Sequence, residues 1–592
     1  VQFAGLLGIG VINDLIQSAY LSLPLALYLL LMPQRWLRSK AARWMLATGS
    51  VLTLAALLFL CIAEYFFFEE FNARFNLVAF DYLMYPAEVI GDIRADYPVN
   101  AVLITAIGFG VLACWLLRQR LLAVSAPIRW PTRLMPALLH MSVVGLALLC
   151  VNTDTLSVSG NRVASELGAN GLGTFFRAAR TSELPYPDYY ATRDTAANFD
   201  LLTSHLARAG GNLTQLAQGR LDRHFAANPH GLGRMNVVVV AEESFGAEFS
   251  RLYGSQRDLT PNFDAYARQS MWFRHMYASG TRTVRGLEAI AASFPPIPSV
   301  SILRRPNNEG IATWGSVMQK QGYQSSFLYG GYGYFDNMNY FFSKNGFEVL
   351  DRSAIDRVRF ENVWGVSDED LFDRALSYYD ARHATAQPFF SIIMTTSNHK
   401  PFTFREGVPG VPAKGGGRAA GVRYADFALG YFLREARKHD WFDNTLFVVV
   451  ADHGARVYGK ADIPLRTYEI PMLFYAPRHL QPRTIETLTS QIDVAPTVLG
   501  LLGLEYEAPF FGTNVLACGA CERIALFSHN HDVALYRNGR LAVLGLNKRM
   551  QTLSYDSASD SYRPVLRDAP LNDLAVAIYQ TAYEQFAAHT YE

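Results

Sequence analysis

Apolar residues follow two different patterns along the chain, and the change between them divides it into two parts. Up to about residue 152, long apolar runs such as LTLAALLFL and VLITAIGFGVLACWLL alternate with short charged segments. From about residue 234 onward, short apolar stretches such as VVVV alternate with amphipathic ones. The first pattern is typical of membrane-spanning helices, and the second is typical of an α/β domain.

The long apolar runs predict four membrane-spanning helices, near residues 11–32, 43–64, 99–117 and 134–152. Each run is close to the ~20 apolar residues that a bilayer crossing requires. Buried helices of a soluble protein are the alternative, but runs of this length and density favour a membrane module. A cleaved signal peptide would explain one run and not four.

Charged residues between these runs predict how the chain crosses the membrane. Segments 33–43 and 118–133 are rich in Arg and Lys, whereas segment 65–98 is rich in Asp and Glu. Because cytoplasmic loops carry the excess of Lys and Arg, both basic segments are expected in the cytoplasm and everything after residue 152 outside it. The same rule puts Val1 outside, and the sequence lacks an initiating Met. We therefore expect that one preceding span is missing.

Composition limits the class of protein. The chain has 592 residues, too many for one core, and is 50% apolar with the excess in its first quarter. Lys and Arg total 53 against 52 Asp and Glu, so the net charge of +1 gives no indication of nucleic acid binding. We expect a transmembrane module at 1–152, a connector with juxtamembrane helices at 153–233 and an extracytoplasmic catalytic domain at 234–592.

The alternation after residue 234 predicts a mostly parallel sheet with helices on both faces. Three of its apolar strands end in polar residues: MNVVVVAEESF at Glu242 and Glu243, PFFSIIMTTSNH at His399, and LFVVVADHG at Asp452 and His453. Ligands of open α/β sheets bind at the carboxyl ends of the strands. Carboxylates and imidazoles together suit zinc or manganese, so a metal site is expected there, with ordinary turns as the alternative.

A hydroxyl-rich turn, ASGTRTVRG, offers a nucleophile in Ser279, Thr281 or Thr283. A hydroxyl bound to a divalent metal becomes a usable nucleophile near neutral pH. Arg282 or Arg285 could neutralise a phosphate beside it. The alternative is a Thr-rich turn with no chemical role.

Taken in order, these motifs resemble the lipoteichoic-acid-synthase-like phosphoglycerol transferases, which belong to the alkaline phosphatase and sulfatase superfamily. The matching stretches are NVVVVAEESF, TPNFDAYARQSMWFRHMYASGTRTVRG, TTSNHKPF, ADHG and SQIDVAPTVLGLLG. The resemblance covers residues 234–505. It implies a sulfatase-like α/β/α domain with a mostly parallel central sheet, behind a helical membrane module that typically has five spans.

The resemblance also implies roles for individual residues. It implies a metal site of four residues: Glu243, Thr283, Asp452 and His453. Manganese is the expected ion, with zinc or magnesium as alternatives. The resemblance makes Thr283 the nucleophile and His399 a substrate-binding residue that assists proton transfer, whereas Glu242 stands where the family often has an apolar residue. Arg285 and Asn337 are further candidates for substrate binding.

The implied reaction takes glycerophosphate from phosphatidylglycerol. Thr283 attacks the phosphorus, diacylglycerol leaves, and a threonine-linked phosphoglycerol passes to an acceptor or to water. The protein would lie in the cell (inner) membrane as a multi-pass protein, with its catalytic domain periplasmic or extracellular. Gram-positive polymer synthases carry Trp and Arg ahead of an Asp-Asn-Met run, but Tyr334 and Phe335 stand there in this chain. An envelope glycan or another lipid is therefore an equally reasonable acceptor.

Other functions remain open. Phosphoethanolamine transferases use a similar GTxT nucleophile but carry many disulfides, whereas this domain has two cysteines. A catalytically silent, lipid-binding regulator of envelope synthesis would be marked by lost metal ligands. A sulfatase would need a C/S-x-P-x-R pattern, which GTRTVRG lacks.

Two features near the C-terminus complete the sequence-based predictions. Cys518 and Cys521 predict a short local disulfide, because the exported domain meets an oxidising compartment. A redox-active or zinc-binding pair is the alternative. The stretch FSHNHDVALYRNGRLAVLGL predicts a hairpin that turns at Asn538 and Gly539, with His529 and His531 on one face of its first strand.

Overall fold

The computed structural model describes residues 2–123, 130–150, 161–181, 184–215, 219–517 and 522–592. The chain forms two compact units. The first contains Val1–Ser182 and Tyr458–Asp462, and the second contains Glu183–Val457 and Ile463–Glu592. The predicted connector is thus shared between the two units.

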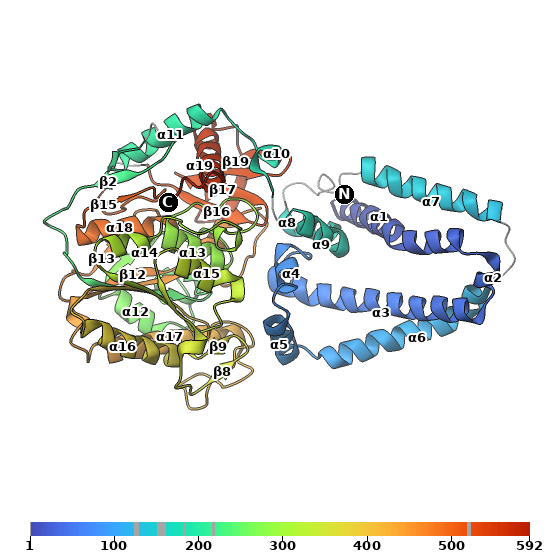
Figure 1. The fold of residues 1–592 in the computed structure, drawn as a ribbon, viewed down its shortest axis with the longest axis horizontal. Coiled ribbons are helices and arrows are strands. Elements are labelled where there is room, and N and C mark those ends of the chain that lie inside the picture. Colours follow the sequence, from blue (N-terminus) through green and yellow to red (C-terminus); the bar gives the residue numbers. More distant parts are fainter. Residues whose placement is uncertain (1, 124–129, 151–160, 182–183, 216–218, 518–521) are drawn as a thin grey trace. The chain divides into compact units, whose positions relative to one another are not determined.

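The first unit is helical. Its elements are α1 (Gln2–Leu31), α2 (Gln34–Leu37), α3 (Lys40–Phe71), α4 (Leu77–Tyr82), α5 (Pro86–Asp96), α6 (Val99–Ala123), α7 (Trp130–Cys150), α8 (Arg162–Gly168) and α9 (Gly171–Arg180). Among the described residues, α1, α3, α6 and α7 are long and apolar enough to cross a membrane. This confirms the four predicted apolar helices. The helix α3 packs on α6, and α1 packs on α7 (Figure 1).

The second unit is built on an eight-stranded sheet with the order β13-β4-β12-β11-β3-β10-β6-β7. Its strands are β3 (Asn236–Glu242), β4 (Met271–Phe273), β6 (Gln324–Tyr329), β7 (Glu348–Leu350), β10 (Phe389–Met394), β11 (Thr445–Ala451), β12 (Met472–Tyr475) and β13 (Arg483–Ile485). The five strands from β11 to β7 run parallel, and β12 is antiparallel to both of its neighbours. The predicted mostly parallel sheet is confirmed.

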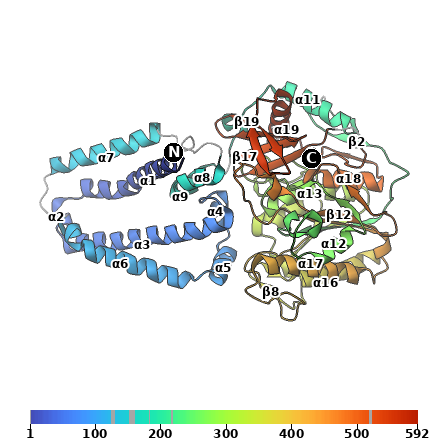
Figure 2. The same ribbon diagram turned by 180° about the vertical axis from the view of Figure 1, so that it is seen from behind.

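Helices cover both faces of this sheet. They are α12 (Pro261–Ala267), α13 (Thr283–Ala292), α14 (Trp314–Lys320), α15 (Met338–Lys344), α16 (Asp368–His383), α17 (Gly417–Ala436) and α18 (Val494–Leu502). Figures 1 and 2 show α12, α16 and α17 on one side of the strands and α13 and α18 on the other. Every residue of β3 is buried, as expected for a central parallel strand whose valines pack on both faces. The α/β/α prediction is therefore confirmed.

A second, antiparallel sheet follows near the C-terminus. It consists of β16 (Ala525–His529), β17 (Asp532–Arg537), β18 (Arg540–Gly545), β19 (Arg549–Asp556) and β20 (Ser561–Pro564), and α19 (Ala569–Ala587) packs against it. The hairpin turn at Asn538 and Gly539 is confirmed, and both residues have positive φ. The single strand predicted to carry both histidines is wrong. Asn530, with φ +52°, turns the chain between His529 and His531.

The smaller elements of the second unit connect these layers. They are the helices α10 (Tyr186–Tyr189) and α11 (Thr195–Arg208), the three-stranded sheet of β1 (Asn212–Leu213), β2 (Arg223–Phe225) and β15 (Tyr506–Ala508), and the pairs β5 (Met276–Tyr277) with β14 (Thr489–Ser490) and β8 (Glu361–Asn362) with β9 (Gly365–Val366). Of these, the β8–β9 pair bears on the site described next.

Candidate active site

Three neighbouring parallel strands deliver the predicted site residues to one edge of the sheet. The strand β3 lies between β11 and β10, with Glu242 opposite Ala451 and Ala241 opposite Met394. The residues that follow these strands therefore meet. Glu243, Asp452 and His453 each offer a ligand atom, and these atoms lie within 4.8 Å of one another.

The two adjacent glutamates face different surroundings because successive strand side chains point to opposite faces. Glu243 faces Asp452 and His453. The buried Glu242 accepts a hydrogen bond from the Thr395 hydroxyl at 3.2 Å, and burial, reinforced by Asp368, raises its pKa well above the usual range. Only one member of the acidic pair belongs to the cluster.

The geometry of Asp452 leaves one of its carboxylate oxygens for a cation. Its Oδ1 accepts the backbone N–H groups of Ser244 at 2.8 Å and of His453 at 2.7 Å. Among the residues that the structure describes, no donor bonds to its buried Oδ2, which lies 3.5 Å from His453 Nε2. A buried carboxylate oxygen without a donor is costly unless a cation compensates it. The residues therefore fit a divalent metal ion.

The imidazole of His453 is held in the tautomer that a metal ligand needs. Its Nδ1 lies 2.7 Å from the carbonyl oxygen of Gly454, which can only accept, so Nδ1 carries the proton. The basic Nε2 then faces Glu243 Oε1 at 3.8 Å. Burial lowers the pKa of His453 and keeps the ring neutral. A second hydrogen bond that fixes the tautomer is a common feature of histidine ligands.

The pKa values of the two carboxylates in the cluster are shifted in opposite directions. Burial, together with the negative charge of Glu243, raises the pKa of Asp452. Burial also disfavours the ionised form of Glu243, but protonation of His453 or His399 would favour it, and the net shift of the Glu243 pKa is downward. Two carboxylates crowded into one buried site disfavour each other's ionisation. A bound cation would remove this repulsion.

Thr283 lies beside the cluster at the first position of α13. Its hydroxyl donates to Glu243 Oε2 at 3.1 Å. It is half-buried and stands at the positive end of the helix dipole, which favours negative charge developing on a hydroxyl oxygen or on a phosphate. The predicted nucleophile and three predicted metal ligands are thus brought together.

His399 is half-buried and follows β10 at the same edge of the sheet. Its Nδ1 donates to the carbonyl oxygen of Lys400 at 3.2 Å, which leaves Nε2 as the basic nitrogen. Its ring packs against Trp364 with centroids 4.0 Å apart. The histidine is thus held outside the carboxylate cluster, and its part in proton transfer stays a prediction.

Two predicted substrate-binding residues have partners within the fold. The guanidinium of the buried Arg285 donates to Glu288 at 2.7 Å, to the carbonyl oxygen of Ile297 at 2.8 Å and to that of Ser299. Asn337 Nδ2 donates to the carbonyl oxygen of Leu303 at 2.8 Å. These bonds hold the segment after α13, and substrate binding by either residue stays a prediction.

Sequence reasoning assigned no role to two supporting residues. Asn398 donates from Nδ2 to the carbonyl oxygens of Glu243 at 2.9 Å and Ser244 at 3.1 Å, so it fixes the turn that carries the first ligand. Arg418 Nη1 donates in turn to the carbonyl oxygen of Asn398 at 2.7 Å. The position of Asn398 beside His399 was the sequence feature that could have indicated its role. No sequence feature indicated the role of Arg418, which lies on α17.

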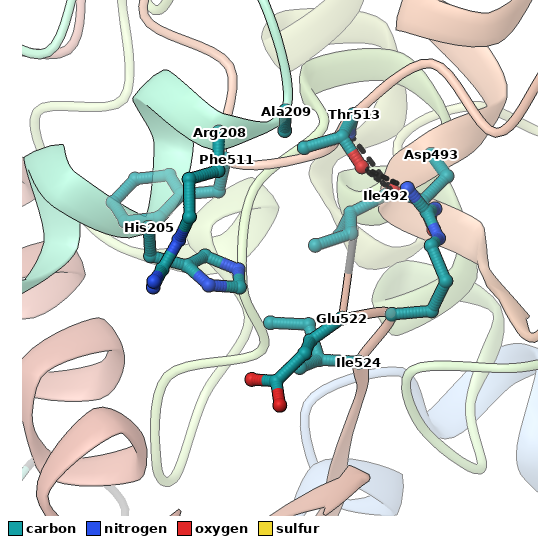
Figure 3. A pocket seen from close by; sticks show the side chains of 10 residues that line it. His205, Arg208, Ala209, Ile492, Asp493, Phe511, Thr513, Glu522 and Ile524 are labelled. Atoms are coloured by element: carbon teal, nitrogen blue, oxygen red, sulfur yellow. Dashed lines mark hydrogen bonds and ion pairs between the residues drawn. The ribbon is translucent and has the colours of Figure 1, made fainter. Parts of the chain in front are cut away.

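Two further features lie apart from these residues. Cys518 and Cys521 fall outside the described residues, so their disulfide stays a prediction. A small cavity of about 20 Å³ is lined by residues around α11 and by the segments around 492, 512 and 523, and Figure 3 shows these residues. It holds none of the predicted site residues.

Comparison with known proteins agrees with this arrangement. The sulfatase family model matches residues 235–504. A crystal structure of a protein in the alkaline phosphatase superfamily from Vibrio parahaemolyticus is 32% identical, covers 69% of this chain and 100% of that chain, and superposes with a TM-score of 0.65. The chain belongs to the alkaline phosphatase superfamily.

Curated relatives narrow the comparison within this superfamily. Lipoteichoic acid synthase 2 of Bacillus subtilis is 23% identical over 331 residues, which cover 51% of this chain and 49% of that protein. Phosphoglycerol transferase I of Citrobacter koseri is 25% identical over 297 residues, which cover 46% of this chain and 38% of that protein. The chain thus spans about half or less of the length of these relatives. The predicted family is confirmed by these matches.

Proposed function

We propose that this protein is a membrane-anchored, metal-dependent phosphoglycerol transferase that takes glycerophosphate from phosphatidylglycerol. The observation that carries the proposal is the position of the Thr283 hydroxyl, 3.1 Å from Glu243 at the start of α13 and beside the Asp452–His453 pair. The similarity to a phosphoglycerol transferase and a lipoteichoic acid synthase supports this donor.

In the first half-reaction, the Thr283 oxygen attacks the phosphorus of the lipid head group. The N-terminal N–H groups of α13 point toward the negative charge that develops there. The proton of the Thr283 hydroxyl passes to His399 Nε2, the bond from phosphorus to the diacylglycerol oxygen breaks, and His399 returns the proton to that oxygen. Glycerophosphate is then esterified to Thr283.

The chain supplies a donor set for the metal. Glu243, Asp452, His453 and Thr283 would hold the ion, and this mixed oxygen and nitrogen set suits manganese, with zinc or magnesium as alternatives. A divalent cation at this position would offset the charge of the phosphate oxygens and of the threonine oxygen.

The decisive experiment is intact-protein mass spectrometry after incubation of the purified full chain with phosphatidylglycerol and Mn²⁺. We expect a glycerophosphate adduct on Thr283 and released diacylglycerol, and we expect neither with Thr283→Ala. Thr281→Ala is the matched control, because Thr281 is a half-buried threonine in the same turn, and it should keep the adduct.

The outcomes separate the alternatives. An adduct from phosphatidylethanolamine instead would make the protein a phosphoethanolamine transferase. Loss of the adduct in Thr281→Ala but not in Thr283→Ala would identify Thr281 as the nucleophile. No adduct and no diacylglycerol with either lipid would leave the catalytically silent, lipid-binding function.

A further inference from the structure

One buried glutamine joins the turn that leads to the nucleophile with the turn that carries a candidate metal ligand. Gln491 begins the short 3-10 helix η9 (Gln491–Asp493) and is fully buried. Its Oε1 accepts the backbone N–H of Ser279 at 2.8 Å, and its Nε2 donates to the carbonyl oxygens of Ala451 at 2.8 Å and Asp452 at 2.7 Å. A single side chain thus spans two halves of the candidate active site.

The orientation of this amide is fixed by its partners. A backbone N–H can only donate and a carbonyl oxygen can only accept, so one arrangement of the amide oxygen and nitrogen satisfies all three partners. Moving any of these partners away would leave a buried polar group without its hydrogen bond, which is costly. The amide of Gln491 therefore ties one backbone segment to the other at a fixed separation.

Other contacts support the nucleophile turn from the side of the second sheet. Ser528, on β16, donates its N–H to the carbonyl oxygen of Ser279 at 2.8 Å, and the carbonyl oxygen of Tyr468 accepts the N–H of Ala278 at 2.8 Å. These contacts attach the turn to β16 and to the segment before β12. Gln491 instead links the turn to the end of β11.

The helix that follows this turn lies close to the same strand end. The helix α13 packs against η9, and a Cβ at Gly286 would lie 2.2 Å from the carbonyl oxygen of Asp452. This packing limits how near α13 can come to β11. The hydrogen bonds of Gln491 limit how far the start of α13, with Thr283, can move away.

The carboxylate of Asp452 is oriented without the help of Gln491. Its Oδ1 accepts the N–H groups of Ser244 and His453, and the backbone N–H of Asp452 donates to the carbonyl oxygen of Glu242 at 3.0 Å. Loss of the Gln491 amide should therefore leave the metal ligands in place and release the nucleophile turn.

We propose that Gln491 is a positioning residue that sets the place of Thr283 relative to the metal ligands. Its amide bonds to backbone groups, so it acts through the nucleophile turn and not on the substrate. The inference rests on the proposed function, because Thr283 is the nucleophile of that reaction. Attack on phosphorus needs the threonine oxygen in a near-attack position, and a displacement of about 1 Å can cost about 10²-fold in rate.

The test is Gln491→Met in the purified full chain, because Met is unbranched and of similar length but lacks the amide. Intact-protein mass spectrometry follows the rate of adduct formation on Thr283 with Mn²⁺ and increasing phosphatidylglycerol. We expect the maximal rate to fall about 10–100-fold, while the lipid concentration for half-maximal rate stays close to its original value. The Mn²⁺ affinity, measured by isothermal titration calorimetry, should also stay close to its original value.

Gln580→Met is the matched control. Gln580, on α19, is also buried, and its amide also makes three bonds: it accepts the N–H of Arg193 at 3.0 Å and donates to the carbonyl oxygen of Arg193 at 3.0 Å and to Glu584 at 2.8 Å. Both variants should unfold at a lower temperature, because each loses the bonds of a buried amide. Measured below both midpoints, the rate should fall only in Gln491→Met.

Hydrogen–deuterium exchange tests the bridge even if Gln491→Met does not fold. In the unchanged protein the N–H of the buried Ser279 should exchange slowly, because it is bonded to Gln491. In folded Gln491→Met this N–H should exchange faster, while the N–H of Ser244, which bonds to Asp452, should keep its protection. Fast exchange at Ser279 in the unchanged protein would refute the bridge.

The rate measurements separate this inference from the proposed function. If the unchanged protein forms the adduct and Gln491→Met forms it as fast as Gln580→Met, the positioning role is refuted while the transferase remains. Loss of Mn²⁺ affinity together with the rate in Gln491→Met would also refute it, because Gln491 would then support the metal ligands. If the unchanged protein forms no adduct on Thr283, the proposed function fails, and the positioning role fails with it.

Discussion

At the scale of single residues, the site is a set of acidic and basic groups that are buried without complete compensation. Asp452 Oδ2 has no hydrogen-bond donor within the described part of the chain, and Glu243 is buried beside it. The neutral His453, fixed by Gly454, directs its basic nitrogen at both. Such a cluster is stable only if a cation or a proton joins it. Metal binding by these residues is therefore a prediction that can be tested apart from turnover.

Replacing Glu243 by Gln is expected to weaken Mn²⁺ binding to the purified chain, because the ligand charge is lost. Even the loss of an outer-shell partner costs about 10–100-fold in metal affinity, and we expect at least that much here. Isothermal titration calorimetry measures the change. Glu406→Gln, at an exposed carboxylate, serves as the control. Equal Mn²⁺ affinity in both variants would show that Glu243 is not a metal ligand.

At the scale of elements, α13 and the turn after β11 are in contact, and a glycine makes this contact possible. A Cβ at Gly286 would lie 2.2 Å from the carbonyl oxygen of Asp452 and 2.8 Å from its carbonyl carbon. Both atoms belong to the backbone, which cannot rotate out of the way as a side chain would. The start of α13, and with it Thr283, is thus placed by the close approach of helix and strand end.

Gly286→Ala is expected to push α13 away from Asp452. We expect a loss of stability of about 1–3 kcal/mol, as for other overpacked sites, and a loss of adduct formation on Thr283 because nucleophile and metal ligands separate. Thermal unfolding and intact-protein mass spectrometry measure the two effects. Gly49→Ala on α3, where a Cβ would meet nothing within 4 Å, is the control. A fully active Gly286→Ala protein would contradict this account of α13.

At the scale of the whole molecule, the chain combines a helical membrane unit with an α/β unit that carries the candidate active site. Four apolar helices of the first unit and the basic segments between them make the chain a multi-pass membrane protein. The same rule places the α/β unit outside the cytoplasm. Its stability at the pH of that compartment depends on buried titratable groups such as His205, which lines the small cavity in Figure 3.

Burial, reinforced by nearby arginines, lowers the pKa of His205 to about 4 from the usual value of 6.5. The unfolded chain therefore binds this proton between about pH 6.5 and 4 while the folded chain does not, so acid favours unfolding. We expect His205 to cost about 2 kcal/mol of stability between pH 7 and pH 5.

Unfolding midpoints followed by circular dichroism against pH test this expectation. The fall in midpoint between pH 7 and pH 5 should be smaller in His205→Asn than in the unchanged protein. His230→Asn, at an exposed histidine, should leave the fall unaltered. An identical pH dependence in both variants would show that His205 is not the titrating group.

Local sequence patterns specify the elements and most of the candidate site residues. Long apolar runs specify bilayer helices because lipid leaves the backbone no other way to satisfy its hydrogen bonds. The four-valine run specifies a buried strand, and polar residues after three such strands meet because parallel strands share one edge. The placement of Glu242, Glu243, Asp452 and His453 at one edge could thus be predicted from local pattern. The resemblance added the choice of Glu243 as the ligand and the role of Thr283.

What each side chain of these segments faces depends on the packing of the folded domain. Glu242 and Glu243 are adjacent residues of the same type, but their side chains point to opposite faces because successive strand side chains alternate. Arg285 bonds to Glu288 and to carbonyl groups of the following segment, which its distance along the chain from Thr283 did not reveal. The support of Glu243 by Asn398 and Arg418 joins segments far apart in sequence. Such contacts depend on how helices and strands pack, and no local pattern encodes that packing.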